Sequence, residues 1–172
     1  MKKSKILDLV IFSMLGCILF MSKIITEPLP NIHPVTMLIA VYTLVYRTRA
    51  LIPICVYIAV SGVFYGFATW WLPYLYIWFI AWAFFMIIPK NASLKVKGIW
   101  TSILCALHGL IYGVLYAPAQ AFLFGLDFDG MIAWIIAGIP FDIIHACGNA
   151  IISVLAIPLY KTILRLEEKR TI

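Results

Sequence analysis

Long apolar stretches that carry almost no charge, separated by short polar segments, make up most of the sequence. Apolar side chains account for 65% of the 172 residues and charged ones for only 12%. An ordinary soluble domain is about half apolar and about a quarter charged, so it has enough polar surface to face water. This chain has too few polar residues to cover its apolar surface in water. It is therefore predicted to be an all-α integral membrane protein with one transmembrane domain over residues 1–172.

Six of the apolar stretches are long enough for membrane-spanning helices, which need about 20 residues with shorter ones tolerated. The first is too long for the apolar core of a signal peptide, and no cleavage motif follows it. The four cysteines fall in four different stretches without a C-x-x-C pair, so we interpret them as small buried apolar residues. The six predicted spans are residues 6–25, 34–47, 51–69, 72–89, 98–117 and 131–160.

The basic residues support this six-span topology. All but one of the 13 Lys and Arg residues fall on the same side of the six spans, and Lys23 is the exception. Cytoplasmic loops of membrane proteins are enriched in Lys and Arg, so both termini are predicted to be cytoplasmic. This asymmetry also explains the net charge of +6 without a nucleic-acid partner.

Three polar residues, Asp142, His145 and Asn149, stand at helical spacing inside the last span. Side chains three and four residues apart share one face of an α-helix. Ionisable groups inside a span cost free energy unless they are paired or hydrated, so this polar stripe is a candidate wall of a binding cavity. Pro140 lacks an N–H group and is expected to loosen the helix nearby. In the alternative interpretation, the stripe only joins two helices, for example through Asp142 and His145 or Lys23.

Aromatic residues are concentrated over residues 65–78, in the segment YGFATWWLPYLYIW. Trp and Tyr favour membrane interfaces, which accounts well for Trp70 and Trp71. Tyr74 and Trp78 continue down one face of the fourth span, where they are equally suited to stack against a ring-containing ligand.

The proline-rich segment 26–34, TEPLPNIHP, is predicted to lie on the outer side, either as a lid over a pocket or as a simple turn. Its polar residues are Glu27, Asn31 and His33. His108, in the fifth predicted span, is a further candidate for the pocket, although a lone buried histidine is more often a hydrogen-bonded structural group.

Several catalytic signatures are missing from the sequence, among them a Walker A motif, H-E-x-x-H and G-x-S-x-G. The cysteine spacing does not suit a metal cluster either. An intramembrane enzyme with Asp142 and His145 as acid and base remains an alternative, since residues at i and i+3 can reach one substrate proton. A structural subunit of a larger membrane complex is a third possibility.

With six predicted spans and three sequence motifs, the chain resembles a group of bacterial substrate-binding S components of energy-coupling factor (ECF) transporters. The first motif is Leu29-Pro30-Asn31-Ile32 after the first span, and the second is the aromatic segment from Tyr65 to Trp78. The third runs from Gly138 to His145, with Asn149 one turn further on. The resemblance implies a six-helix bundle in the bacterial cell membrane that is not an enzyme.

The resemblance further implies a subunit that binds a vitamin-type micronutrient in an outward-facing pocket. Such a subunit docks on a transmembrane coupling protein driven by two ATPase subunits, so ATP is used by the partners and this chain needs no cofactor. S components commonly dock through small residues of the first helix, which here are Ser13, Gly16 and Cys17. In this picture Trp71, Tyr74 and Trp78 provide stacking, Asp142, His145 and Asn149 provide polar contacts, and Glu27, Asn31 and His33 lie on the lid.

Among the cargoes of that family, a corrinoid (cobalamin-like) molecule would suit a wide cavity with aromatic walls. Smaller rings such as a pyridoxine or a pyrimidine remain open. The metal-binding members are not expected, because they share a Met-His start and this chain begins MKKSKIL.

Overall fold

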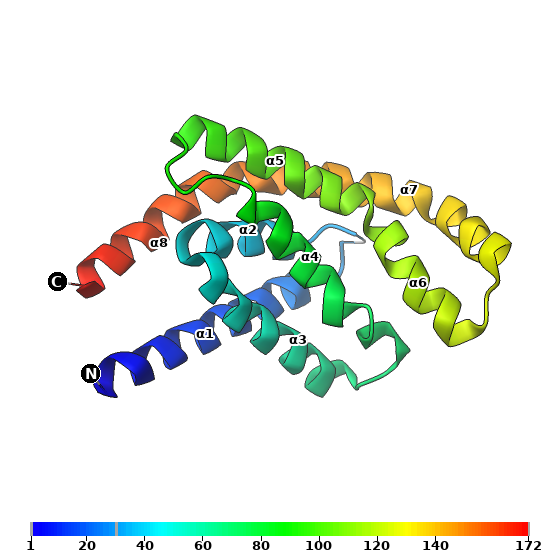
Figure 1. Ribbon diagram of the computed structural model, residues 1–172, viewed down its shortest axis with the longest axis horizontal. Coiled ribbons are helices and arrows are strands. Elements are labelled where there is room, and N and C mark those ends of the chain that lie inside the picture. Colours follow the sequence, from blue (N-terminus) through cyan, green and yellow to red (C-terminus); the bar gives the residue numbers. More distant parts are fainter. Residues whose placement is uncertain (1, 30, 172) are drawn as a thin grey trace.

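The computed structural model describes residues 2–29 and 31–171, and every regular element in this part of the chain is helical, which confirms the all-α class. Three short 3-10 helices, Arg47–Ala50, Thr69–Trp71 and Ser153–Leu155, precede α3, α4 and α8, respectively. The α-helices (Figure 1) are α1 (Lys2–Thr26), α2 (Val35–Tyr46), α3 (Leu51–Tyr65), α4 (Tyr74–Met86), α5 (Leu94–Leu110), α6 (Tyr112–Phe124), α7 (Phe128–Ile152) and α8 (Ala156–Thr171).

Five helical runs in the described residues are long and apolar enough to cross a membrane, which supports an integral membrane protein. The six-span topology and the cytoplasmic termini remain predictions. One run joins α2 and α3 through Arg47, whose φ of 54° is unusual for a residue other than glycine and turns the chain. The five runs are Lys5–Thr26, Val35–Tyr65, Thr69–Met86, Leu94–Phe124 and Phe128–Arg170.

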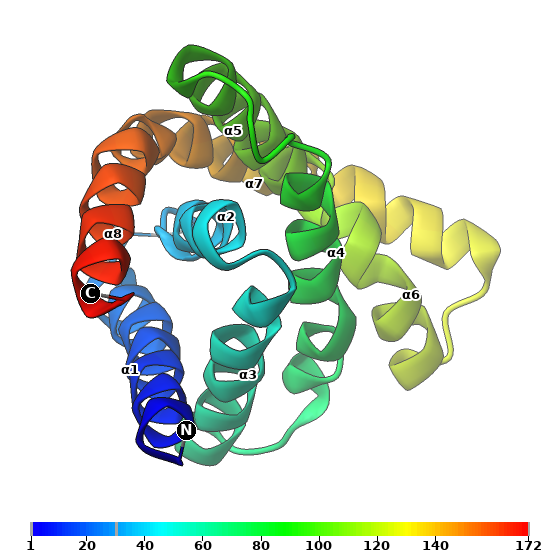
Figure 2. The same cartoon turned by 60° about the vertical axis from the view of Figure 1, so that its left-hand side comes forward.

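Helix α2 lies in the middle of the bundle, with α1, α4, α5 and α8 around it (Figure 2). All its residues from Val35 to Leu44 are buried. The helix carries no charged residue and is apolar on most sides, so a position enclosed by other helices buries it best. Its first residues follow directly on the segment 27–34, which places that segment beside the bundle core.

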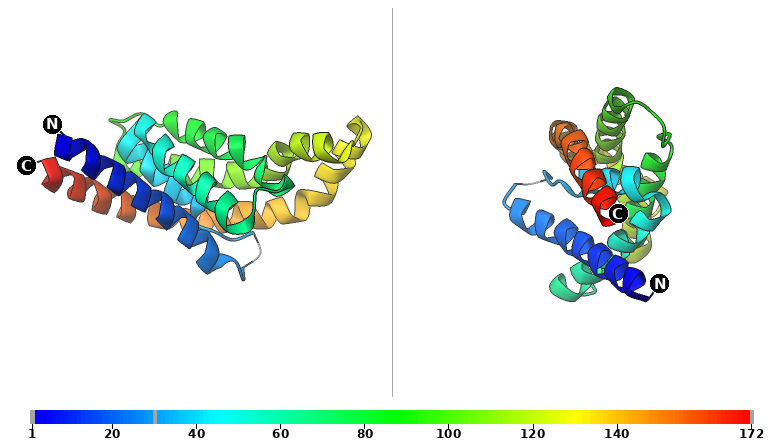
Figure 3. Two further views of the ribbon diagram at one scale, coloured as in Figure 1. Left: turned by 90° about the horizontal axis from the view of Figure 1, so that it is seen from below. Right: turned by 90° about the vertical axis from the view of Figure 1, so that its left-hand side faces the viewer.

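Helices α5 and α7 run side by side, and α6 with the first half of α7 extends beyond the rest of the bundle (Figures 1 and 3). A Cβ atom at Gly109 of α5 would lie 2.8 Å from the backbone nitrogen of Ala146, so only glycine permits this close approach. The helix breaks at Ile111, inside the predicted span 98–117, and α6 then starts in a new direction. The sequence did not predict this break.

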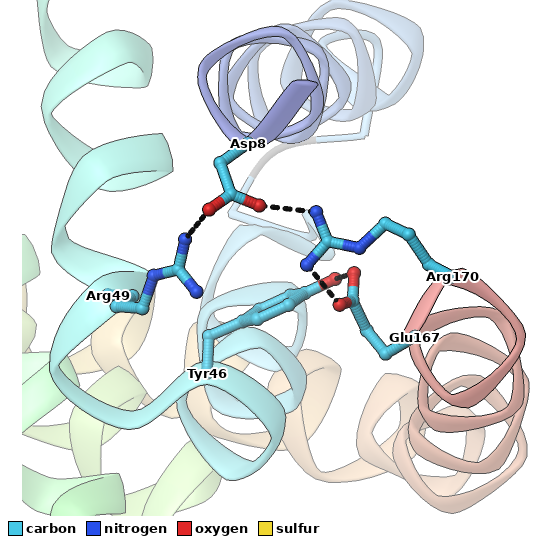
Figure 4. A network of polar contacts seen from close by, with 5 residues as sticks. All are labelled: Asp8, Tyr46, Arg49, Glu167 and Arg170. Carbon is cyan, nitrogen blue, oxygen red and sulfur yellow. Dashed lines mark hydrogen bonds and ion pairs between the residues drawn. The ribbon is translucent and has the colours of Figure 1, made fainter. Parts of the chain in front are cut away.

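The two termini lie at the same end of the molecule (Figure 3), where one carboxylate ties three segments together (Figure 4). Asp8 of α1 accepts hydrogen bonds from Arg49, at 2.5 Å, and from Arg170 of α8. Arg170 also pairs with Glu167 at 2.6 Å, and Glu167 accepts a hydrogen bond from the Tyr46 hydroxyl at 3.0 Å. The network fixes α1 and α8 against the turn between α2 and α3.

The expected docking residues of α1 lie on two different faces of the helix. Ser13 and Cys17 line an open apolar groove of about 520 Å³. Gly16 is buried against α3 instead, where an added Cβ would lie 2.8 Å from the carbonyl oxygen of Pro53. Gly16 therefore contributes to the packing of α1 against α3. Of the three expected docking residues, Ser13 and Cys17 lie on a surface that a partner could reach.

The prediction that all four cysteines are buried is wrong for three of them. Cys105 is buried, whereas Cys17, Cys55 and Cys147 are exposed on the helix surfaces. Lipid tails are as apolar as a protein core, so an apolar side chain in a membrane helix has no need to face inward.

Candidate functional site

The three histidines of the chain meet in one group of rings. His33, just before α2, has its ring centroid 4.8 Å from that of His145 in α7. His145 in turn lies 4.9 Å from Tyr112 of α6, and the Tyr112 ring is 6.0 Å from His108 of α5. Residues from four separate parts of the sequence therefore share one site.

Trp78 of α4 lies at the centre of these rings and is fully buried. Its ring centroid is 5.5 Å from Tyr57 of α3, 5.3 Å from Tyr74, 5.8 Å from His108 and 6.2 Å from Tyr112. Such ring pairs stabilise packing beyond the area they bury. We refer to the following seven residues as the ring cluster: His33, Tyr57, Tyr74, Trp78, His108, Tyr112 and His145.

Several polar atoms of the ring cluster are buried and lack a hydrogen-bond partner among the described residues. They include His33 Nδ1, Trp78 Nε1 and His145 Nε2. Buried polar groups in folded proteins are nearly always bonded, and each one left alone costs about 1–3 kcal/mol. Three such atoms on neighbouring rings form the pattern expected where a bound molecule supplies the partners.

His108 differs from the other two histidines because part of its ring is already bonded. Its Nδ1 atom lies 3.3 Å from the Thr36 hydroxyl oxygen of α2, and its side chain is fully buried. This contact holds α5 against the central helix and fixes the His108 ring against Trp78.

The polar stripe on α7 faces inward as predicted, but its three residues have different partners. The Asp142 carboxylate accepts hydrogen bonds from the backbone N–H of Gly113, at 3.0 and 3.1 Å. The Asn149 side-chain amide donates to the carbonyl of Cys105 at 3.1 Å. The two ends of the stripe thus join α7 to α6 and α5, while His145 between them points into the ring cluster.

The break at Ile111 explains why Asp142 is held in this way. Because α6 begins at Tyr112, the Gly113 N–H lies in its first turn, where backbone N–H groups lack helical partners and the helix dipole favours an anion. An added Cβ at Gly113 would collide with the Asp142 carboxylate. The expected loosening of α7 does not break the helix, which continues through Pro140 from Phe128 to Ile152.

Two small cavities flank the segment before α2. One, of about 240 Å³, is lined by Asn31, Tyr112 and Asp142 among others. The other, of about 160 Å³, is lined by Lys23, Glu27, Asn31 and His33 with three neighbours. All three residues predicted for the lid therefore lie at a cavity, and Asn31 lines both.

The backbone of this segment is fixed by local conformation and by contact with α7. Asn31 has a φ of 58°, a left-handed conformation that asparagine adopts more readily than most residues. Ile32 rests on Gly148 of α7, with its Cγ1 atom 3.2 Å from where a Cβ of residue 148 would be. Pro30 of the L-P-N-I motif lies outside the described residues.

Lys23 lies against aromatic rings rather than beside Asp142. Its ammonium group is 4.3 Å from the ring centroid of Tyr65 and 5.4 Å from those of Trp70 and Tyr74, which are favourable cation–π distances. No described carboxylate forms an ion pair with it. The suggested contact between Lys23 and Asp142 does not form.

Of the three residues predicted to stack on a ligand, Tyr74 and Trp78 belong to the ring cluster and Trp71 does not. The Trp71 indole N–H donates to the Ile58 carbonyl at 2.8 Å, so its ring is turned toward α3. Trp70 is the neighbour of Tyr74 instead, with ring centroids 5.4 Å apart.

No pattern in the sequence pointed to Tyr57, which stands in a largely apolar segment. Tyr112 was detectable in principle, because it follows His108 by four residues. The break at Ile111 separates the two on different helices, yet their rings stay in contact.

His33 is uncharged in its position at the edge of the bundle. Burial lowers its pKa from 6.5 to about 3, and the nearby His145, His108 and Lys23 act in the same direction. Its ring therefore offers one donor and one acceptor nitrogen at neutral pH.

Comparison of the chain with protein-family models, with curated proteins and with solved structures gives no match.

Proposed function

We propose that this protein is the membrane-embedded substrate-binding subunit of an uptake transporter of the energy-coupling factor type. The observation that carries the proposal is the ring cluster, in which His33 Nδ1, Trp78 Nε1 and His145 Nε2 are buried without hydrogen-bond partners. A core built only for stability would place apolar side chains there, because they leave no polar group unsatisfied. Binding sites combine such apolar walls with a few polar atoms that orient the ligand.

The position of the ring cluster supports uptake from outside the cell. The segment before α2 begins at the end of α1 that is remote from Asp8 and the terminal network. If the termini are cytoplasmic, as the Lys and Arg distribution predicts, this segment and the cluster beside it lie toward the outer side. The segment then provides the natural entrance for the substrate.

Transport against a gradient requires energy, and the sequence contains no Walker A motif. A transmembrane coupling protein with two ATPase subunits would supply the energy. The open face of α1, with Ser13 and Cys17, is the surface on which we expect the coupling protein to dock. Small residues allow such close helix approach within a membrane.

The cavity volumes favour a small substrate. Cavities of about 240 and 160 Å³ beside the ring cluster are below the roughly 300–1,000 Å³ of pockets for drug-sized ligands. A corrinoid is much larger than either cavity. Among the cargoes considered above, a single substituted ring fits the space better.

An acid–base enzyme is less well supported by the geometry. Both carboxylate oxygens of Asp142 accept hydrogen bonds from Gly113, and the carboxylate is not hydrogen-bonded to His145. A general acid and base acting on one substrate would need both groups directed at the same proton.

Mass spectrometry of the small molecules that co-purify with the detergent-solubilised protein tests the proposal. We expect the wild type and Trp71→Phe to retain the same vitamin-like molecule, because Trp71 lies outside the ring cluster. Trp78→Phe and His145→Phe, which remove unpaired polar atoms but keep a ring, should lose it. A folded wild type without any retained molecule, or equal retention by all four proteins, would count against a binding subunit.

A further inference from the structure

Lys23 is the exception in the charge asymmetry of the chain, because every other Lys and Arg falls on the opposite side of the predicted spans. It stands in the last turn of α1, within the apolar run Lys5–Thr26, and it is half-buried. Charged residues are rare within membrane spans, and where they occur they mark ligand paths and binding sites. The surroundings of Lys23 therefore indicate what it binds.

The Lys23 ammonium is held by aromatic rings but has no counter-ion. Its nitrogen lies 4.3 Å from the ring centroid of Tyr65 and 5.4 Å from those of Trp70 and Tyr74, and no described carboxylate forms an ion pair with it. Glu27 shares a cavity of about 160 Å³ with Lys23, but it is exposed and accepts a hydrogen bond from the Tyr65 hydroxyl at 3.2 Å. The rings position the ammonium and leave its N–H donors for a partner.

Polar and apolar side chains both line this cavity. Lys23, Asn31 and His33 bring N–H donors to it, while Leu29 and Ile32 supply apolar surface. The Nδ1 atom of His33 is buried and has no hydrogen-bond partner among the described residues. A neutral histidine ring donates from one nitrogen, so this atom becomes a donor in one of the two tautomers. A ligand group with several acceptor lone pairs suits such a set of donors.

A carboxylate matches the charge and the donors together. Its two oxygens accept several hydrogen bonds, and its negative charge makes those bonds roughly twice as strong as neutral ones. A cavity of about 150 Å³ is enough for a benzene-sized molecule, so the cavity at Lys23 holds a ring beside Leu29 and Ile32. His33 lines the cavity and Tyr74 lies under the ammonium, and both belong to the ring cluster. The cavity is therefore continuous with the proposed substrate site.

We infer that the cavity at Lys23 binds the carboxylate of the substrate, which is a small organic acid with an apolar body about the size of one ring. This inference rests on the proposed function and specifies the substrate class of the same site. It assigns to Lys23 the role of counter-ion for the ligand.

Calorimetric titration of the purified protein in detergent at pH 7.5 with three probes of nearly identical shape tests the inference. The probes are benzoate, an anion, benzamide, which is uncharged, and benzamidinium, a cation. We expect benzoate to bind on the order of tenfold more tightly than benzamide, because its hydrogen bonds are charge-assisted. Benzamidinium should bind most weakly, because it brings a second positive charge to Lys23 and has only N–H donors.

Two variants connect the result to the site. Lys23→Met keeps a long side chain over the rings but removes the charge, so benzoate should lose about tenfold in affinity while benzamide changes little. Lys5→Met is the matched control, because it removes one positive charge from an exposed position near the other end of α1. It should keep the preference of the wild type. If Lys23 served packing alone, Lys23→Met would bind both probes less well, with their ratio unchanged.

An anionic lipid headgroup is the other source of a negative group beside Lys23. Native mass spectrometry of the protein with added phosphatidylglycerol separates the two sources. We expect the wild type, Lys23→Met and Lys5→Met to retain the same number of lipids. Loss of a lipid in Lys23→Met but not in Lys5→Met would assign the cavity to a headgroup and overturn the inference.

The outcomes separate this inference from the proposed function. Equal binding of benzoate and benzamide, tighter binding of benzamidinium, or a preference for benzoate that persists in Lys23→Met would overturn the inference. A co-purified molecule that has no acidic group and is lost in His145→Phe would also overturn it, but would leave the binding subunit intact. A wild type that retains no molecule argues against the proposed function itself.

Discussion

The rings of His33 and His145 lie with their centroids 4.8 Å apart, one on the segment before α2 and the other in the middle of α7. Together with the contact of Ile32 on Gly148, this pair holds the segment against the helix that carries the polar stripe. The ring cluster therefore joins the segment before α2 to the polar stripe of α7.

Acidification should destabilise the protein through His33. Its pKa is about 3 in the folded protein and 6.5 in the unfolded chain, so the unfolded state takes up the proton first. The contribution of His33 to stability is therefore complete above pH 6.5 and is lost as the pH drops toward 3, by up to about 1.4 kcal/mol per pH unit. Thermal unfolding in detergent between pH 7.5 and 4.5 measures this. His33→Phe should flatten the profile, and an unchanged slope would show that other groups cause the loss.

The two ends and the middle of the polar stripe should respond differently to substitution. Asp142→Asn keeps an oxygen for the Gly113 N–H, so the variant should fold and retain the co-purified molecule. His145→Phe should fold as well and lose the molecule, because among the three stripe residues it is His145 whose side chain has an unpaired atom in the ring cluster. Mass spectrometry of both purified variants makes the comparison. Loss of the molecule in Asp142→Asn alone would assign substrate recognition to the carboxylate instead.

A methyl group at residue 113 should weaken the contact between α6 and α7. In Gly113→Ala the new Cβ would displace the Asp142 carboxylate, and overpacking of this kind costs about 1–3 kcal/mol. Gly138→Ala in α7 is the matched control, since an added Cβ there meets no atom within 4 Å. Its higher helix propensity should stabilise the protein by about 0.5–1 kcal/mol. Equal unfolding midpoints for the two variants would contradict the close approach at Gly113.

The terminal network should contribute modestly to stability. Asp8→Ala removes the carboxylate that joins Arg49 and Arg170, and ion pairs this close to the solvent contribute little each, so the unfolding midpoint should fall only slightly. Chemical denaturation in detergent at low and high salt measures the effect, which salt should reduce. Lys161→Ala, at an exposed position of α8 outside this network, serves as the control and should match the wild type. A similar loss in both variants would show that the network adds nothing specific.

Much of the architecture was predictable from the sequence. The apolar fraction determined the membrane class, and the break at Arg47–Ala50 falls between the predicted spans 34–47 and 51–69. Helical spacing correctly placed Asp142, His145 and Asn149 on one inward face. These features depend on local composition and periodicity, which a single helix already expresses.

Tertiary structure alone decided which residues meet. Nothing in the sequence distinguished Trp70 from Trp71, placed Gly16 against α3, or brought His33, His108 and His145 to one point. In a soluble protein, the contrast between apolar and polar faces shows which side of a helix turns inward. Lipid removes that contrast because it is as apolar as the core, so the inward side is decided by close packing and by the hydrogen bonds of a few polar groups.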